Sequence, residues 1–244
     1  MNKIITIHPG KDKDNNDEVF SSFSLAQGEM CSICGNTGSG KSQLIKDIEL
    51  MANRDSVTKR VIHIDGALGV RDNSKQLIAH LSQNMRFVLD SSVEEFIELH
   101  KECRQNSTIS VNDVLILANK ITSEKIVRTA NLNELSGGQT RALMIADIAL
   151  ICDSPIVLID EIENAGINKK LALETLLSKD KIVLIVTHDP QIILMAEKRI
   201  VLRNGAIIKV IKRSKSEEVI LREIEEIDTK LSSLQQQLRK GEKL

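Results

Sequence analysis

Residues 35–42 read Gly-Asn-Thr-Gly-Ser-Gly-Lys-Ser, and this glycine-rich octapeptide constrains the fold more than any other feature of the chain. It follows an apolar run at 30–34 and precedes apolar residues at 44, 45, 48 and 51, a spacing typical of a helix. A glycine loop between a strand and a helix is the context of a P-loop, in which backbone N–H groups close on phosphate oxygens. We therefore expect this loop to bind the phosphates of a nucleotide.

Each position of the loop then has an expected role. Lys41 is expected to reach the β- and γ-phosphates, and the hydroxyl of Ser42 is expected to ligate Mg²⁺. The expected nucleotide-binding residues are Gly35, Asn36, Thr37, Gly38, Ser39, Gly40, Lys41 and Ser42. A glycine-rich turn with a chance lysine is the alternative, but every fixed position of the motif is present in the expected context.

An apolar run at 155–159 ends in the acidic pair Asp160 and Glu161. Two carboxylates at the end of a buried strand cost desolvation energy unless a cation or a polar network receives them. In a P-loop protein the first acid holds Mg²⁺ through water, and the second polarises the attacking water. A solvated turn is the alternative interpretation, and the P-loop in the same chain argues against it.

Residues 135–139 read Leu-Ser-Gly-Gly-Gln and precede a helical pattern. Ser136 and the amides of Gly137 and Gly138 would form a small anion-binding concavity at the N-terminus of that helix. This pentapeptide matches the LSGGQ signature, and with the P-loop and the acidic strand the chain resembles the ATP-binding cassette (ABC) ATPases over about residues 1–210. The resemblance implies that Ser136, Gly137, Gly138 and Gln139 close on the γ-phosphate of ATP held by the P-loop of another subunit.

The resemblance also implies roles for Gln83 and His188. Without it, Gln83 would be interpreted as a surface residue and His188 as a structural one. Gln83 lies between the P-loop and the signature, where the family has a glutamine that contacts Mg²⁺ and the attacking water. His188 follows an apolar run at 182–186 and resembles the histidine that contacts the γ-phosphate. The expected catalytic residues are therefore Glu161, His188, Gln83 and Lys41, and the expected Mg²⁺ ligands are Ser42, Gln83 and Asp160.

The pattern of elements predicts an α/β P-loop fold of the ABC type. Near-continuous apolar runs separated by helical segments indicate a mostly parallel core sheet. Alternating residues at 3–8 and 19–25 indicate an N-terminal antiparallel β hairpin, and helical spacing from 91 to about 134 indicates an inserted helical subdomain. We divide the chain into an ATPase core with its N-terminal β subdomain (1–83 and 135–210), the helical signature subdomain (84–134) and a C-terminal heptad helix (211–244).

The C-terminal heptad helix carries apolar residues at alternating spacings of four and three, from Ile220 to Leu238. Packing of this stripe on the chain's own core and binding of a partner helix are both compatible with fewer than three heptads.

Composition excludes several classes of function. The formal net charge is −1, with 33 basic and 34 acidic side chains, and there is no Trp or Tyr, so no direct binding of nucleic acid is expected. No apolar run is long enough to cross a membrane, and the first nine residues do not form a secretion signal. Cys31 and Cys34, two of the four cysteines, are expected to be buried structural thiols in a reducing compartment, because residues three apart on a strand point to opposite faces and suit neither a metal site nor a disulfide. We expect a cytoplasmic protein that reaches the inner face of the membrane only through a partner.

The sequence departs from the family in three places. No aromatic residue matches the family's adenine-stacking position, where His8 is the candidate substitute. Residues 162–168 differ from the usual continuation of the acidic pair, with Asn168 where the family commonly has Asp. Asp147 stands where transporter subunits commonly have Arg.

Two functions use such an ATPase. The expected one is an ATP-hydrolysing subunit that dimerises head to tail around two Mg-ATP, as a homodimer or with another ABC subunit, and powers a separate membrane permease. The alternative is an ABC ATPase that remodels, activates or repairs a soluble protein complex, which the heptad helix and the unusual 162–168 region favour. The insertion of about fifty residues excludes the long internal coiled coils of chromosome-condensation ATPases.

Overall fold

The computed structural model describes residues 3–65, 77–83, 85–104, 108–162 and 166–241, apart from the side chains of 232, 236 and 239. Its strands are β1 (Ile4–His8), β2 (Phe23–Ala26), β3 (Met30–Cys34), β4 (Val61–Ile64), β5 (Ile78–Leu81), β6 (Ile156–Asp160), β7 (Ile182–Val186), β8 (Lys198–Arg203) and β9 (Ala206–Lys212). Its helices are α1 (Lys41–Glu49), α3 (Val93–Cys103), α4 (Val111–Ile121), the 3₁₀ turn Leu132–Glu134, α5 (Gly137–Leu150), α6 (Lys169–Ser178), α7 (Pro190–Met195) and α8 (Lys215–Arg239).

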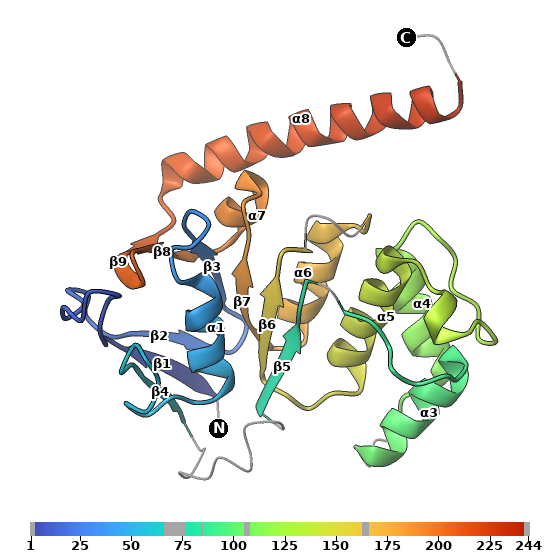
Figure 1. Cartoon of the computed structure of the whole chain (residues 1–244). Helices are drawn as coiled ribbons and strands as arrows, with labels where there is room; N and C mark the ends of the chain where they lie inside the picture. The colour runs from blue at the N-terminus through green and yellow to red at the C-terminus, as the bar shows by residue number, and fades with distance from the viewer. Residues whose placement is uncertain (1–2, 66–76, 84, 105–107, 163–165, 242–244) are drawn as a thin grey trace.

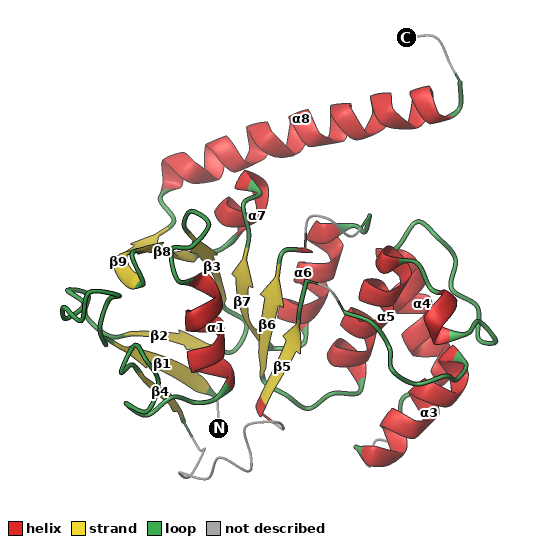
Figure 2. Ribbon diagram, in the orientation of Figure 1, coloured by secondary structure: helices red, strands yellow, loops and turns green. Residues whose placement is uncertain are grey.

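A six-stranded sheet in the order β5-β6-β7-β3-β8-β9 forms the centre of the fold (Figures 1 and 2). All neighbours from β5 to β8 pair in parallel, and β9 returns antiparallel to β8. The mostly parallel sheet and the α/β class are therefore confirmed. Strands β5, β8 and β9 were not predicted, and they extend the sheet on both sides of the three strands that were.

The N-terminal β subdomain is a three-stranded antiparallel sheet in the order β2-β1-β4. The predicted hairpin is confirmed, with Ile4 opposite Ala26 and Ile7 opposite Phe23, but its second strand begins at Phe23 and not at residue 19. The reason is that Val19 is 99% exposed, so it lies outside the alternation that buries Leu25. The helix after the P-loop also ends earlier than the apolar spacing suggests, because Met51 adopts a left-handed backbone with φ 49°.

Three apolar clusters hold these layers together. The first fills the space between the two sheets around α1, and the second lies on the other face of the six-stranded sheet, under α5, α6 and α7. The third cluster joins α3 and α4 to the outer side of α5. Helix α5 therefore contributes residues to both the core and the helical layer.

The predicted helical stretch from 91 to 134 consists of α3, α4 and the 3₁₀ turn. Both helices begin at a serine that forms a capping box, Ser92 with Glu95 and Ser110 with Asp113. Such caps satisfy amide groups at the helix start that have no partner within the helix, and each contributes about 1 kcal/mol.

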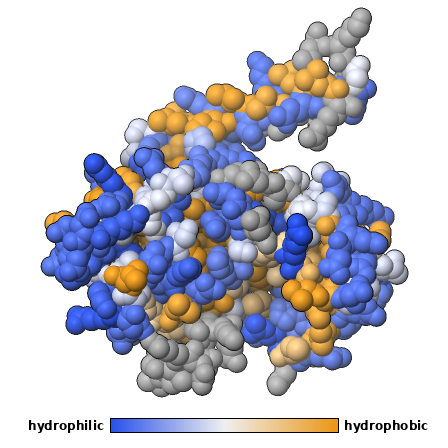
Figure 3. Space-filling model, viewed as in Figure 1, coloured by the Kyte–Doolittle hydropathy of each residue, from blue (hydrophilic) through white to orange (hydrophobic). Residues whose placement is uncertain are grey.

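Helix α8 begins at Lys215, because β9 continues to Lys212. It is held at its start by an ion pair between Arg199 and Glu217 at 2.6 Å, which holds the pKa of the Glu217 carboxyl at about 2. Its apolar stripe is only partly covered: Ile220, Ile227, Leu231 and Leu238 are 46–66% exposed. The exposed apolar surface along α8 is visible in Figure 3.

Candidate nucleotide-binding site

The glycine loop joins the C-terminus of β3 to the N-terminus of α1. Gly40 is the N-cap of α1 with φ 107°, and a Cβ at this position would lie 2.8 Å from the Cα of Gly205. Gly38 also has a left-handed backbone, with φ 77°, and no atom lies within 4 Å of the position a Cβ would take. The first turn of α1 holds no acidic residue, so the amides at this helix start face an environment that favours an anion.

Lys41 and Ser39 complete the loop. The Nζ of Lys41 donates to the carbonyls of Gly35 at 2.6 Å and Asn36 at 3.1 Å, which places the ammonium over the loop. The hydroxyl of Ser39 is buried and has no hydrogen-bond partner within the described residues. A cationic side chain, an unsatisfied donor and a helix start thus converge on one loop, and this donor set fits the phosphates of a nucleotide.

The strand register brings the other predicted catalytic residues to the same edge of the sheet. Leu81 of β5 pairs with Ile159, and both Asp160 and Ile33 pair with Val186 of β7. The residues that follow these positions therefore leave the sheet together at its carboxyl edge. Those residues are Gln83, Glu161, His188 and the P-loop from Gly35.

Two of these residues touch directly. The Nε2 of Gln83 donates to the Oε2 of Glu161 in a short hydrogen bond. Glu161 has a left-handed backbone with φ 50°, and its amide donates to the carbonyl of Val186 at 3.0 Å. A non-glycine residue in this conformation stores strain of about 1–3 kcal/mol and is held there by its surroundings. The side chains of Gln83, Glu161 and His188 are all accessible to solvent at this edge.

Arg141 binds the main chain of both Gln83 and Glu161, and the sequence analysis did not predict this role. It lies on α5, five residues after the signature serine, and is buried. Its Nη1 donates to the carbonyl of Glu161 at 2.6 Å, and its Nη2 donates to the carbonyls of Ser82 and Gln83, both at 2.9 Å. One guanidinium therefore connects the signature helix to the backbones of both Gln83 and Glu161. Only the planar fork of an arginine presents donors in this fixed geometry.

Arg141→Lys is expected to lower kcat about 10- to 100-fold, because Glu161 and Gln83 lose their common support and small displacements of catalytic groups cost that much. The ATP concentration at half-maximal rate is expected to stay within about twofold, since the P-loop is untouched. Steady-state phosphate release measures both quantities. Arg128→Lys, at an exposed pair with Glu94, is the matched control. A kcat equal to that of the control would show that Arg141 has no positioning role.

The signature residues lie elsewhere in the chain. Ser136 caps α5, with its Oγ accepting from the amide of Gln139 at 3.3 Å and the Oε1 of Gln139 accepting from the amide of Ser136 at 2.9 Å. The first turn of α5 is also free of acidic residues, so Gly137 and Gly138 present amides to an anion. Within one chain, however, the P-loop leads into α1, which packs on one face of the six-stranded sheet, whereas α5 packs on the other face, under the helical layer (Figure 1). The structure therefore does not bring the signature to its own P-loop.

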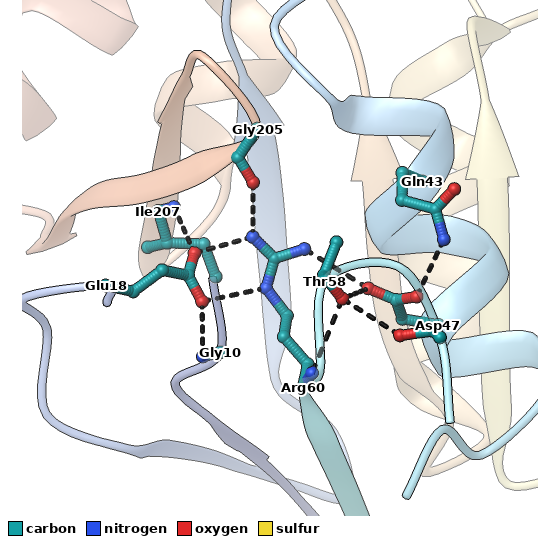
Figure 4. A network of polar contacts seen from close by, with 9 residues as sticks. Gly10, Glu18, Gln43, Asp47, Thr58, Arg60, Gly205 and Ile207 are labelled. Atoms are coloured by element: carbon teal, nitrogen blue, oxygen red, sulfur yellow. Dashed lines mark hydrogen bonds and ion pairs between the residues drawn. The ribbon is translucent and has the colours of Figure 1, made fainter. Parts of the chain in front are cut away.

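A buried charge network supports the P-loop from the side of the N-terminal β subdomain (Figure 4). Arg60, with no exposed side-chain surface, forms ion pairs with Glu18 at 2.5 Å and with Asp47 of α1 at 3.2 Å. Gln43 and Thr58 add hydrogen bonds to Asp47 at 2.8 and 2.6 Å. Every charge in this network thus has a partner, which a buried ion pair requires.

The same network fixes the turn between β8 and β9 against the P-loop. The Nη2 of Arg60 donates to the carbonyl of Gly205 at 2.6 Å, and the amide of Gly205 donates to the carbonyl of Ser39 at 2.8 Å. Lys13 lies against the same turn, since its amide donates to the carbonyl of Asn204 at 3.0 Å, and its Nζ donates to the carbonyl of Gly38 at 2.7 Å. Neither Arg60 nor Lys13 was predicted to act near the loop.

The residues that depart from the family are only partly described. Residues 163–165 of the 162–168 region lie outside the described residues. The side-chain oxygen of Asn168 caps α6 by accepting from the backbone amide of Leu171 at 3.0 Å. The backbone amide of Asn168 donates to the carbonyl of Ile121 at 2.8 Å. His8 ends β1 opposite Val61 and is half-buried. Asp147 contacts the Nδ1 of His100 at 2.6 Å.

All four cysteines are free. Of the two thiols expected to be buried, Cys31 is buried and Cys34 is only partly so. Burial raises the pKa of both thiols, so they stay protonated at neutral pH and are poor metal ligands.

The residues at the carboxyl edge also fit a magnesium ion. Ser42 would offer a hydroxyl, Asp160 a carboxylate and Gln83 an amide oxygen, which are the kinds of oxygen ligand that Mg²⁺ takes in proteins. No cluster of three or more His, Cys, Asp or Glu exists among the described residues.

The fold and the site together define a P-loop nucleotide-binding protein. A family model described as ABC transporter matches residues 20–164. An uncharacterized ABC transporter ATP-binding protein of Methanocaldococcus jannaschii is 49% identical over 99% of this chain and 95% of its own length. The macrolide export ATP-binding/permease protein MacB of Campylobacter jejuni is 30% identical over 82% of the chain, which spans 32% of that protein. The solved structure of CbiO1 from Clostridium perfringens, part of an ABC transporter complex, superposes with a TM-score of 0.67 at 18% identity, over 97% of this chain and 100% of that one.

This chain belongs to the ABC transporter family, as one of its ATP-binding, ATP-hydrolysing proteins. Among the described residues, no helix is both long and apolar enough to cross a membrane.

Proposed function

We propose that two copies of the chain, or this chain and a second ABC subunit, bind two ATP molecules head to tail and power a separate membrane permease. The separation of P-loop and signature within one chain carries the dimer proposal. Lys41 and Ser42 hold the phosphates on one protomer, while Ser136 and the amides of Gly137 and Gly138 complete the site from the other. Closure of two such half-sites excludes water and makes hydrolysis depend on dimerisation.

Within each closed site the residues have distinct roles. Glu161 orients and deprotonates the attacking water, and Gln83, which touches Glu161, keeps that carboxylate and the water in line. Lys41 and His188 neutralise the charge that develops on the γ-phosphate, and Gln139 keeps Ser136 in place by capping α5. Ser42, Asp160 and Gln83 would hold Mg²⁺, and the bound ion would supply positive charge against the charge that develops on the phosphates.

The proposed parts of the chain serve this cycle. Residues 1–83 and 135–210 act as the ATP-binding core, and 84–134 act as a signature subdomain that turns relative to it, with Arg141 at the junction. A permease helix is proposed to dock where the two parts meet near Gln83, which would bring the protein to the inner face of the membrane. The family model supports a transporter, as does the similarity to MacB and to the energy-coupling factor transporter ATP-binding protein EcfA1 of Mycoplasma capricolum, which is 28% identical over 78% of this chain.

Co-purification tests the permease partner. The Glu161→Gln chain, expressed in its source cells and loaded with ATP and Mg²⁺, is expected to bring down a multi-span membrane protein in stoichiometric amount, identified by mass spectrometry. The Lys41→Ala chain, which should not close on nucleotide, is the matched control. Recovery of only a soluble partner complex by the Glu161→Gln chain would contradict the transporter role and support the remodelling ATPase.

A further inference from the structure

Glu124 lies at the signature of its own chain, outside every motif named above. It belongs to the loop after α4 and is exposed. Its Oε2 accepts a hydrogen bond of 2.6 Å from the Oγ of Ser136. A carboxylate thus occupies the start of α5, where the helix dipole and the signature amides favour an anion.

The hydrogen bonds of Ser136 can be counted. A serine hydroxyl has one proton to donate and two lone pairs to accept with. The Ser136 hydroxyl gives its proton to Glu124 and accepts from the amide of Gln139. While this geometry holds, Ser136 has no donor left for a phosphate oxygen.

The backbone around Glu124 is held on both sides. Before it, Thr122 is bridged to Ile167, and the Oγ1 of Thr122 accepts from the amide of Glu124 at 3.2 Å. After it, the carbonyl of Lys125 accepts from the Nε2 of Gln139 at 3.1 Å. The exposed side chain of Glu124 can rotate away while this backbone stays in place.

We propose that Glu124 is a gate on the signature: its carboxylate occupies Ser136 in the resting protomer and must leave before Ser136 can donate to the γ-phosphate held by the other protomer. This inference rests on the proposed head-to-tail dimer. Glu124 competes with the γ-phosphate for one donor and repels it by charge, so it raises the ATP concentration at which the dimer closes. ADP, which lacks the γ-phosphate, binds a single P-loop without displacing Glu124.

Light scattering of Glu161→Gln chains against ATP concentration tests the gate. Adding Glu124→Ala or Glu124→Gln is expected to lower the ATP concentration at half-maximal dimerisation about tenfold, the effect of one hydrogen bond to a charged group. The affinity for ADP and the melting temperature are expected to stay the same. Glu134→Gln, which removes another exposed acid close to the signature, is the matched control.

The outcomes separate the gate from the dimer. Dimerisation of the Glu161→Gln parent with an unchanged midpoint in both Glu124 variants would overturn the gate and leave the dimer intact. Absence of dimers at saturating ATP in every variant would overturn both. An equal shift in ADP affinity would mean that Glu124 acts on the fold and not on the γ-phosphate.

Discussion

Glu161→Gln is expected to bind ATP with unchanged affinity, to hydrolyse it about 10²- to 10⁴-fold more slowly, and to accumulate as a closed dimer. Glu161 follows Asp160 at the carboxyl edge of the sheet, and its carboxylate contacts Gln83. Hydrogen bonds with Val186 and Arg141 hold its main chain in a left-handed conformation. Glutamine keeps the size of this side chain and one oxygen that can accept from Gln83, but it cannot take a proton from water. The two ATP molecules then stay intact and keep the protomers together.

Single-turnover hydrolysis and equilibrium binding of ATP separate the two effects. Glu174→Gln, on α6 outside the site, is the matched control and is expected to hydrolyse ATP at the normal rate. Normal hydrolysis by Glu161→Gln would remove Glu161 from the role of base. Loss of ATP binding in the same variant would mean instead that Glu161 holds the nucleotide.

Arg60→Met is expected to lower the free energy of unfolding by about 3–5 kcal/mol, because it leaves the carboxylates of Glu18 and Asp47 buried without their cation. Both carboxylates have fully buried side chains in the present structure. The hydrogen bond to the carbonyl of Gly205 is lost as well, which frees the β8–β9 turn from the P-loop. Nucleotide affinity is therefore expected to fall together with stability.

Urea unfolding and ATP titration measure these two effects. Lys46→Met removes an exposed cation from the same helix as Asp47 and is expected to change stability by less than about 0.5 kcal/mol. A stability of Arg60→Met equal to that of Lys46→Met would mean that the network is not a stabilising unit.

The parts of the fold that carry phosphate chemistry could be predicted from the sequence, because there one motif specifies backbone conformation, side-chain chemistry and position in the sheet together. The glycines at 38 and 40 adopt left-handed conformations, and β3, β6 and β7 carry the long apolar runs of strands buried on both faces. Parallel register then places Asp160 and His188 at one edge without further information, whereas the place of Gln83 depends on β5, which was not predicted.

Strands β8 and β9 were missed although the sequence holds a signal for them. Asn204 and Gly205 form the turn between them with φ 51° and 83°, and Asn-Gly flanked by alternating apolar residues is the strongest short-range hairpin signal. By contrast, β5 has four residues and is interrupted by His80, so no pattern of that length distinguishes it from a loop.

The contacts of Arg60, Arg141 and Glu124 could not be predicted from one sequence. Arg60 follows Lys59 and reads as an exposed charge, whereas its partner Glu18 lies 42 residues away. A buried ion pair depends on which distant segments are in contact in the fold. The apolar periodicity of a sequence indicates local secondary structure and does not predict such contacts. The proton of Ser136 is likewise taken by a residue twelve positions earlier, which no motif specifies.

Mixing two inactive chains tests whether the ATPase site is shared between two protomers. Lys41→Ala disables the P-loop and Ser136→Arg disables the signature, so neither variant alone can form a complete site with itself. A heterodimer of the two contains one complete site, and an equimolar mixture is expected to recover up to about a quarter of the wild-type ATPase rate. A mixture as inactive as its separate components, with dimers present, would contradict the proposal that the signature of one chain serves the P-loop of another.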